Sequence, residues 1–160
     1  MLDKKLSVIA YLLLVYGIKK EYEIFEDLIF EYGENEKPYI KNYPDIFFNI
    51  SHCKYGVVCA ISNEEVGIDI EEVSNYEEAV ANYICNEREY NSLVNSKNQV
   101  VDFCKLWTVK ESVLKFTGKG ICTDLKSVLN NLHFKIETVC SPDNRYVISV
   151  CEKAKGFTDE

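Results

Sequence analysis

Proline and glycine are scarce in this 160-residue sequence, which contains 3 of the first and 7 of the second. Collagen-like, low-complexity and wholly disordered chains are excluded, because they need much more of one or both residues. Hydrophobic residues make up 47% of the sequence, which is enough for an ordinary globular core. We find no internal repeat at the periods of solenoid proteins. The sequence therefore predicts a compact globular fold.

Positive charge is also in short supply, with 18 Lys and Arg against 26 Asp and Glu and a formal net charge of -8. General nucleic-acid binders and proteins that coat anionic membranes carry the opposite sign. We therefore expect no nucleic-acid partner and no membrane partner. A polyanionic ligand would have to be held by a few well-placed residues.

Long apolar runs and paired cysteines are missing as well. The longest apolar run near the start, residues 8–16, is too short to cross a bilayer and is not followed by a secretory cleavage pattern. The seven cysteines are an odd number without a CxxC pair, which argues against a disulfide framework and against a zinc site. We expect reduced, mostly buried cysteines and a cytoplasmic protein.

Apolar periodicity predicts blocks of helix and blocks of strand. Helices are expected over residues 3–20, 23–30, 76–85, 87–95 and 100–116. Strands are expected over residues 46–50, 55–61, 66–70, 132–139 and 146–151, with a surface loop over 33–44. The first three strands are expected to pair as an antiparallel meander. Separate blocks of helices and antiparallel strands favour an α+β fold.

Two carboxylates lie two residues apart at the strand expected over 66–70. Because side chains alternate along a strand, Asp69 and Glu71 share one face, while Ile68 and Ile70 share the other. Two neighbouring anions repel unless a cation or a proton lies between them, and carboxylate oxygens suit Mg²⁺. The alternative is a solvent-exposed face at the end of a half-buried strand.

Three side chains share one face of the helix expected over 100–116, because Trp107, Glu111 and Lys115 are spaced by four. Glu111 and Lys115 are either an ordinary surface ion pair or parts of a site in which Glu111 adds a third carboxylate to a Mg²⁺ centre. In the second interpretation, Lys115 neutralises phosphate charge beside the ion.

A hydroxyl and an imidazole close the first expected strand, at Ser51 and His52. A phosphate would favour the protonated imidazole, so these two side chains could clasp a phosphate group. The alternative for His52 is an ordinary turn histidine.

Five short segments along residues 37–120 carry a family resemblance. They are residues 37–39, 48–52, 67–71 and 87–90, and the stretch from Trp107 through Lys110, Glu111 and Lys115 to residues 118–120. One such match would be a modest signal, but five in register make chance an implausible explanation. On these segments the sequence resembles the 4'-phosphopantetheinyl transferases of the surfactin-activating (Sfp) type.

The resemblance implies transfer of the 4'-phosphopantetheine arm from coenzyme A to a serine of an acyl or peptidyl carrier protein, with release of adenosine 3',5'-bisphosphate. It also implies that Asp69, Glu71 and Glu111 hold Mg²⁺ against the coenzyme A diphosphate. Lys115 would stabilise charge on that diphosphate. Glu111 is the first choice for the general base and Glu89 the second, because the sequence does not show which lies near the incoming serine.

The same resemblance places coenzyme A, the co-substrate, against several further residues. Lys37 and Pro38 would flank the adenine, while Ser51 and His52 would meet the nucleotide phosphates. Ser7 corresponds to the family's hydroxyl residue in the first helix, although the basic residue that usually precedes it is absent here.

The implied fold is a pseudo-dimer of two α+β halves, residues 1–64 and 65–160, with the active site in the cleft between them and the metal site in the second half. The first half lacks the strand that usually comes first in the family, so its sheet is expected to expose an edge. We expect a monomer, with a dimer through that edge as the alternative.

Three functions from different classes compete. The first is the active transferase, and the second is a binding module for coenzyme A or a carrier protein that has lost turnover. The third, a Mg²⁺-dependent nuclease, is disfavoured by the charge of -8. Tyr76, Val80 and Ile84 form a helical stripe that either belongs to the core or accepts a helix of the carrier protein.

Overall fold

The computed structural model describes residues 2–33, 37–119, 124–130 and 133–154 of the chain. Its helices are α1 (Leu2–Tyr22), α2 (Glu78–Ile84), α3 (Glu87–Val94) and α4 (Gln99–Thr117). Its strands are β1 (Phe30–Tyr32), β2 (Pro38–Ile40), β3 (Phe47–Cys53), β4 (Gly56–Ser62), β5 (Val66–Glu72), β6 (Phe134–Cys140) and β7 (Tyr146–Lys153). These elements confirm the α+β class.

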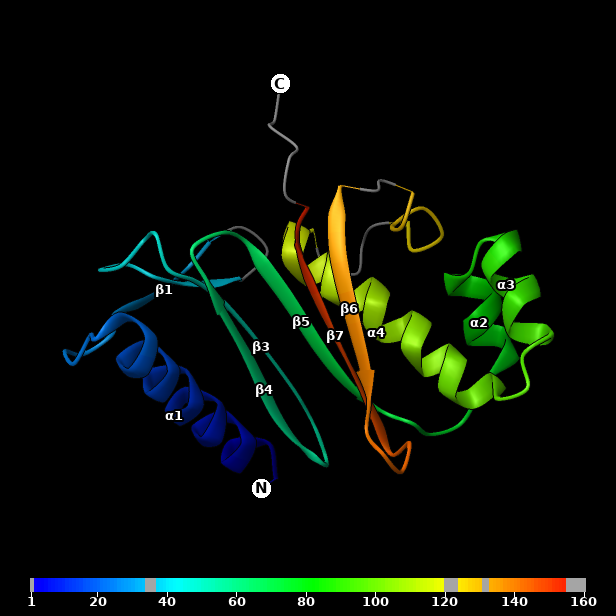
Figure 1. Ribbon diagram of the computed structural model, residues 1–160, viewed down its shortest axis with the longest axis horizontal. Coiled ribbons are helices and arrows are strands. Elements are labelled where there is room, and N and C mark those ends of the chain that lie inside the picture. The colour runs from blue at the N-terminus through cyan, green and yellow to red at the C-terminus, as the bar shows by residue number, and fades with distance from the viewer. Residues whose placement is uncertain (1, 34–36, 120–123, 131–132, 155–160) are drawn as a thin grey trace.

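The strands form small antiparallel sheets, in which β1 pairs with β2, β3 pairs with β4, and β7 lies between β5 and β6. β5 lies beside β3 (Figure 1), and side-chain hydrogen bonds cross the seam between them. The Ile68 amide donates to Asn49 Oδ1 at 3.0 Å, and the Ser51 hydroxyl donates to Asp69 Oδ1 at 2.8 Å. The seam therefore joins the β3–β4 hairpin to the sheet that contains β5.

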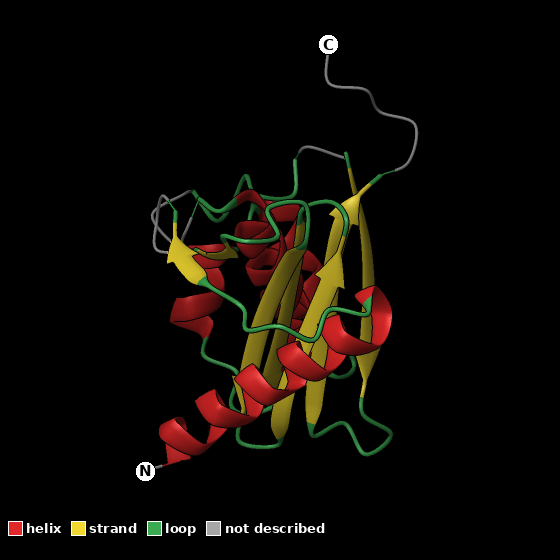
Figure 2. Ribbon diagram, turned by 90° about the vertical axis from the view of Figure 1, so that its left-hand side faces the viewer, coloured by secondary structure: helices red, strands yellow, loops and turns green. Residues whose placement is uncertain are grey.

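α1 covers the β3–β4 hairpin, and Figure 2 shows it crossing in front of the strands. Every fourth residue of one stripe is buried, namely Leu6, Ala10, Leu14 and Ile18. Leu14 and Ile18 pack with Ile40 and Phe48 in one core cluster. An apolar stripe at a spacing close to 3.6 residues is typical of an amphipathic helix. α1 buries this stripe against the hairpin.

α4 lies antiparallel across β5 and also packs on β7. Its approach to β5 is closest at Gly67, where an added Cβ would lie 2.0 Å from the Ser112 backbone oxygen and 2.5 Å from the Phe116 nitrogen. No side chain fits at that position. The glycine thus lets α4 lie directly over the residues that follow it on the same face of β5.

The remaining helices build a second core on the far side of α4. α2 and α3 pack against α4 and the segment 124–130 through Ala81, Ile84, Leu93, Leu114 and Leu125. Gly118 ends α4 in the left-handed conformation, with a φ of 66°, as the predicted stop requires. Gly120, the second predicted stop, lies outside the described residues.

Most predicted elements are confirmed, with small shifts at their ends, although residue 132 of one predicted strand lies outside the described part. The helix predicted over 23–30 is wrong. Glu23 has a φ of 56°, which takes the chain out of the helical region, and the segment then runs to β1. Its apolar residues Ile24, Leu28 and Phe30 reach the core from this irregular backbone.

Two further expectations about strands are corrected. The loop predicted over 33–44 contains β2, because Ile40 is fully buried and pairs with Phe30 of β1. The predicted meander of three strands is wrong, since β5 pairs with β7 and lies beside β3. The reason is side-chain chemistry that strand periodicity does not reveal, namely the bonds from Asn49 and Ser51 of β3 to β5.

The cysteines and the helices agree with two simpler expectations. The described cysteines are free thiols at positions 53, 59, 85, 104, 140 and 151, and three of them are buried. Cys122 lies outside the described residues. No described helix is long and apolar enough to span a membrane.

Candidate functional site

β5 presents an acidic face to α4. Gly67, Asp69 and Glu71 share this face, and the buried Ile68 and Ile70 share the other, as the strand period predicts. Asp69 is only 2% exposed and Glu71 is half-buried. The alternative of a solvent-exposed face is wrong, because α4 covers this part of the strand.

α4 brings a matching stripe of polar side chains to that face. The Trp107 indole N–H donates to Glu71 Oε1 at 3.1 Å, and Lys115 Nζ lies 2.6 Å from Asp69 Oδ1. Glu111, one turn from each, is 9% exposed. The predicted stripe is therefore confirmed as a contact between α4 and β5, and Lys115 pairs across the two elements with Asp69.

Ser51 of β3 completes the contacts of Lys115. Its hydroxyl accepts a hydrogen bond from Lys115 Nζ at 2.9 Å and donates one to Asp69 Oδ1 at 2.8 Å. Three elements that are distant in the sequence, β3, β5 and α4, thus supply side chains to a single polar cluster.

Two buried carboxylate oxygens in this cluster, Asp69 Oδ2 and Glu111 Oε1, have no hydrogen-bond partner. Burial, followed by the charge of Asp69, raises the pKa of the Glu111 carboxyl, and Lys115 opposes the shift. Burial and the charge of Asp69 also raise the pKa of the Glu71 carboxyl, while the hydrogen bond from the Trp107 N–H and the charge of Lys115 lower it. Unpaired buried carboxylate oxygens next to like charges favour the entry of a cation.

The donor set of the cluster fits a hard divalent cation, which takes carboxylate oxygens and keeps part of its shell for water or phosphate. As the side chains lie, no group of three His, Cys, Asp or Glu within the described ranges is placed to hold an ion. The Lys115 ammonium donates a hydrogen bond to Asp69 Oδ1, and Glu71 Oε1 accepts one from the Trp107 indole N–H. An ion bound through Asp69 Oδ1 would therefore compete with Lys115, whereas Asp69 Oδ2 has no hydrogen-bond partner.

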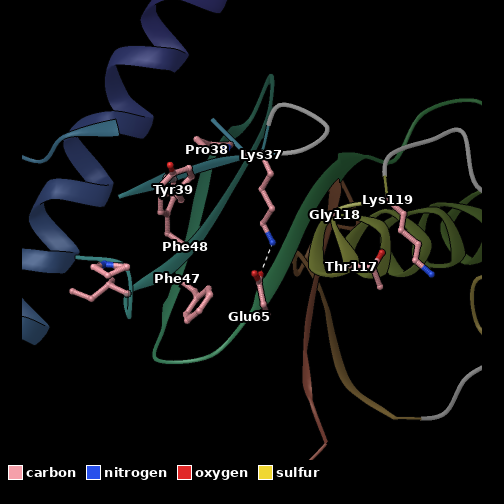
Figure 3. Close-up of a pocket in the computed structure, with 12 residues that line it drawn as sticks. Lys37, Pro38, Tyr39, Phe47, Phe48, Glu65, Thr117, Gly118 and Lys119 are labelled. Atoms are coloured by element: carbon pink, nitrogen blue, oxygen red, sulfur yellow. Dashed lines mark hydrogen bonds and ion pairs between the residues drawn. The ribbon is translucent and has the colours of Figure 1, made fainter. Parts of the chain in front are cut away.

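A cavity of about 630 Å³ is lined by Glu65, which directly precedes β5, and by Thr117, which is two residues beyond Lys115 on α4. Figure 3 shows Lys37, Pro38 and Tyr39 on one side of it, with Thr117, Gly118 and Lys119 at the end of α4 on the other. Its wall also contains the aromatic rings of Phe47 and Phe48. The cavity therefore lies between β2–β3 and the C-terminal end of α4.

Lys37 spans the cavity. Its ammonium lies 2.5 Å from Glu65 Oε2 (Figure 3) and 3.4 Å from the Phe116 carbonyl oxygen. The structure thus brings the predicted Lys37 and Pro38 to a hollow with aromatic walls and two lysines. Such a lining suits a flat, partly apolar group that carries negative charge nearby.

Two other predicted site residues, His52 and Ser7, are exposed. His52 is exposed, on the opposite face of β3 from the buried Ser51. Ser7 is exposed on α1. Neither residue lines the cavity beside Lys37.

Glu89 lies on α3 and pairs with Lys110. The sequence did not predict this partner. Lys110 is 0% exposed, and its ammonium lies 2.8 Å and 3.1 Å from the two Glu89 oxygens and 2.7 Å from the Leu125 carbonyl oxygen. Glu89 also closes a capping box with Asn86 at the start of α3. The spacing of Asn86 and Glu89 could have revealed the cap, whereas nothing local marks Lys110 as buried.

Comparison with known proteins bears on this site. A family model described as the 4'-phosphopantetheinyl transferase superfamily matches residues 65–158. The match includes β5 and α4, and with them Asp69, Glu71, Glu111 and Lys115.

Three curated proteins are similar in sequence. The 4'-phosphopantetheinyl transferase gsp of Aneurinibacillus migulanus is 40% identical over 125 residues, which are 77% of this chain and 50% of that protein. The transferase psf-1 of Bacillus pumilus is 35% identical, over 79% of this chain and 56% of its own length. The transferase Sfp of Bacillus subtilis (strain 168) is 36% identical, over 72% and 53%. The chain thus spans about half the length of the curated relatives it matches.

Proposed function

Because the chain belongs to the 4'-phosphopantetheinyl transferase superfamily, we propose that it transfers the 4'-phosphopantetheine arm of coenzyme A to a serine of an acyl or peptidyl carrier protein. The observation that carries the proposal is the buried cluster in which Asp69 and Glu111 each keep an unpaired carboxylate oxygen beside Glu71 and Lys115. Thr117, two residues beyond Lys115 on α4, lines a cavity of a size and lining that suit a nucleotide.

Asp69, Glu71 and Glu111 would hold a Mg²⁺ ion at this cluster. When bound, the ion supplies positive charge to the diphosphate of coenzyme A, where negative charge develops during transfer. The unpaired oxygens of Asp69 and Glu111 are the first ligands available, because no hydrogen bond has to be broken to use them. The Trp107 N–H keeps Glu71 pointing at the same region.

Lys115 provides the second cation. In the structure its ammonium donates hydrogen bonds to Asp69 Oδ1 and to the Ser51 hydroxyl. Once the carboxylates are neutralised, the Lys115 ammonium is free to turn to the diphosphate and stabilise the leaving adenosine 3',5'-bisphosphate. Ser51 and His52 remain our proposed contacts for the nucleotide phosphates, and Ser7 a proposed contact from α1.

Glu111 is our proposed general base. Its raised pKa, caused first by burial, makes the carboxylate a better proton acceptor than an exposed glutamate. The carrier serine would lose its proton to Glu111 as its oxygen attacks the phosphorus that bears the arm. The bond from that phosphorus to the bisphosphate oxygen then breaks. Glu89 is less suited to this role, because it is bonded to Lys110 and to the Asn86 amide.

The adenine would lie in the cavity between Lys37 and Pro38 on one side and the end of α4 on the other. We further propose that this cavity is part of a cleft between the halves 1–64 and 65–160. The free thiols of the described cysteines support the cytoplasm as the place of the reaction.

The direct test is to incubate the protein with coenzyme A, Mg²⁺ and an apo carrier protein, and to weigh the carrier by mass spectrometry. We expect a gain of one phosphopantetheine arm, and no gain in the presence of EDTA. Binding of coenzyme A without any gain would instead support a binding module that has lost turnover, and an equal gain in EDTA would contradict the role of the ion.

A further inference from the structure

β4 has one edge to which no described strand is paired, because it pairs with β3 alone over the residues Gly56–Ser62. None of these seven residues is fully buried, and none carries a charge. Val57, Val58 and Ile61 are β-branched, and the strand contains no proline. An edge of this kind presents unpaired N–H and C=O groups to which another strand can add. The edge of β4 is therefore a place where a second chain can pair.

β6, which lies at the edge of the three-stranded sheet, is protected against such pairing. Lys135 and Glu137 carry opposite charges on this strand, and both side chains are more than half exposed. Charged side chains on an edge strand oppose pairing with another chain. The contrast points to β4, and not to β6, as the edge available to a partner.

α1 lies against β4, on the side of the hairpin away from β5 (Figure 1). The contact is close, because an added Cβ at Gly17 would lie 2.5 Å from Cδ1 of Ile61 on β4. Tyr11 marks the side of α1 that faces β1 and β3, since its ring packs edge-to-face on Phe30 with 6.1 Å between the ring centroids. The opposite flank of α1 therefore lies on the β4 side of the helix.

This opposite flank is apolar and exposed. Ile9, Leu13 and Tyr16 follow one another at the helical spacing of four and three, and they are 49%, 37% and 63% exposed. Leu12, which is 58% exposed, continues the flank outward. We refer to these four residues of α1 and residues 56–62 of β4 as the β4–α1 surface.

The β4–α1 surface is large enough for a specific interface. At roughly 150–200 Å² for a fully exposed large side chain, the four residues of α1 expose about 350 Å². The partly exposed residues of β4 raise this area to roughly 600 Å² per copy, or about 1,200 Å² for two copies, which is the lower end of the range for stable interfaces.

We propose that a second copy of this chain covers the β4–α1 surface in a symmetric dimer. β4 and its copy pair antiparallel across a two-fold axis, so each strand offers the other the same row of donors and acceptors. Both α1 helices then lie on one face of the joined strands, and their apolar flanks meet beside the axis. A second copy fits this surface because the surface is uncharged and matches itself. The inference thus favours a dimer over the expected monomer.

Two variants block the surface from its two elements. Tyr16→Glu places a charge on the apolar flank of α1, at a position exposed in one chain. Val57→Lys places a charge on the edge strand, opposite the exposed His52 of β3, so the single chain should still fold. Val139, which is 64% exposed on β6, provides the matched controls Val139→Glu and Val139→Lys.

Sedimentation equilibrium over a range of protein concentrations tests the proposal. We expect the wild type to reach twice the chain mass of 18.5 kDa. Tyr16→Glu and Val57→Lys should each weaken the dimer at least about tenfold, while both Val139 variants should dimerise like the wild type. A wild type that keeps the mass of one chain at the highest concentration would overturn the inference, as would a dimer that either surface variant leaves unchanged.

Thermal unfolding provides a second readout and checks the fold of each variant. A dimer that dissociates on unfolding melts at a higher temperature as the protein concentration rises. We expect this rise for the wild type and the Val139 variants, and its loss in the two surface variants. A wild-type melting temperature that is independent of concentration would overturn the inference. Neither measurement uses coenzyme A or a carrier protein, so the result is independent of the proposed function.

Discussion

Lys115 Nζ of α4 lies 2.6 Å from Asp69 Oδ1 of β5, so an ammonium occupies one oxygen of the most deeply buried acid in the site. Asp69, Glu71 and Glu111 carry three negative charges when ionised, and Lys115 returns one positive charge. The remaining formal charge of -2 matches one divalent cation. One divalent cation would neutralise this remaining formal charge, which supports the proposed ion.

Removing a charged ligand should abolish transfer without unfolding the chain. We expect Asp69→Asn and Glu111→Gln each to lower turnover by at least about a hundredfold, because the ion and Lys115 lose the charge that positions them. Carrier mass spectrometry measures the turnover, and thermal unfolding checks the fold. Glu137→Gln, at an exposed acid on β6, is the matched control and should transfer normally. Full activity in Asp69→Asn would contradict the assignment.

The close contact at Gly67 should be essential for the site. In Gly67→Ala the new Cβ would lie 2.0 Å from the Ser112 backbone oxygen, so α4 must move away from β5. We expect a loss of stability of about 1–3 kcal/mol from overpacking, together with a fall in turnover as Glu111 and Lys115 shift. Gly56→Ala, where no atom lies within 4 Å of the added Cβ, should leave both properties nearly unchanged. Denaturant titration and the transfer assay check the pair.

Lys110 and Glu89 should act on stability. Lys110→Met leaves the Glu89 carboxylate without its partner, and we expect the free energy of unfolding to fall by about 3 kcal/mol. Glu89→Gln keeps an acceptor for Lys110 and for the Asn86 amide, so the folded variant should retain at least about a tenth of the wild-type turnover. A folded Glu89→Gln without measurable turnover would show that Glu89, and not Glu111, is the base.

The raised pKa values of Glu71 and Glu111 predict how the metal-free protein responds to pH. A carboxyl whose pKa rises on folding stabilises the folded state below its ordinary pKa of 4.5, and this stability is lost as pH rises through the raised value. Metal-free Glu111→Gln should therefore melt a few degrees above the wild type near pH 7, and the difference should shrink toward pH 4. Mg²⁺ should raise the melting temperature of the wild type and do so less for the variant. A metal-free variant that melts at a lower temperature than the wild type near pH 7 would show that the buried Glu111 carboxylate does not destabilise the fold.

The sequence predicted the faces on which the cluster side chains lie better than it predicted the order of the strands in the sheet. Period two on β5 and period four on α4 placed Asp69, Glu71, Glu111 and Lys115 on the correct faces, because local geometry fixes side-chain direction. The meeting of those faces follows from Gly67, whose steric role becomes visible only when α4 is in place.

The misses have a common physical cause. β5 lies beside β3 because Asn49 and Ser51 bond to it, and such long-range hydrogen bonds leave no periodic signal. Lys110 is buried because Glu89 and the Leu125 carbonyl oxygen surround its charge, and a lysine in an amphipathic helix normally faces solvent. Contacts with residues distant in the sequence thus determine the place of β5 and the burial of Lys110, and the local sequence pattern does not predict such contacts.

Counting divalent ions per chain tests the central claim most directly. Mn²⁺, which shares the preference of Mg²⁺ for carboxylate oxygens, can be titrated into the protein in the presence of coenzyme A and followed by its paramagnetic signal. We predict one tightly bound ion per chain, lost in Asp69→Asn and in Glu111→Gln but kept in Glu137→Gln. Binding that is absent from the wild type, or unchanged in both ligand variants, would contradict the claim that these carboxylates hold one ion.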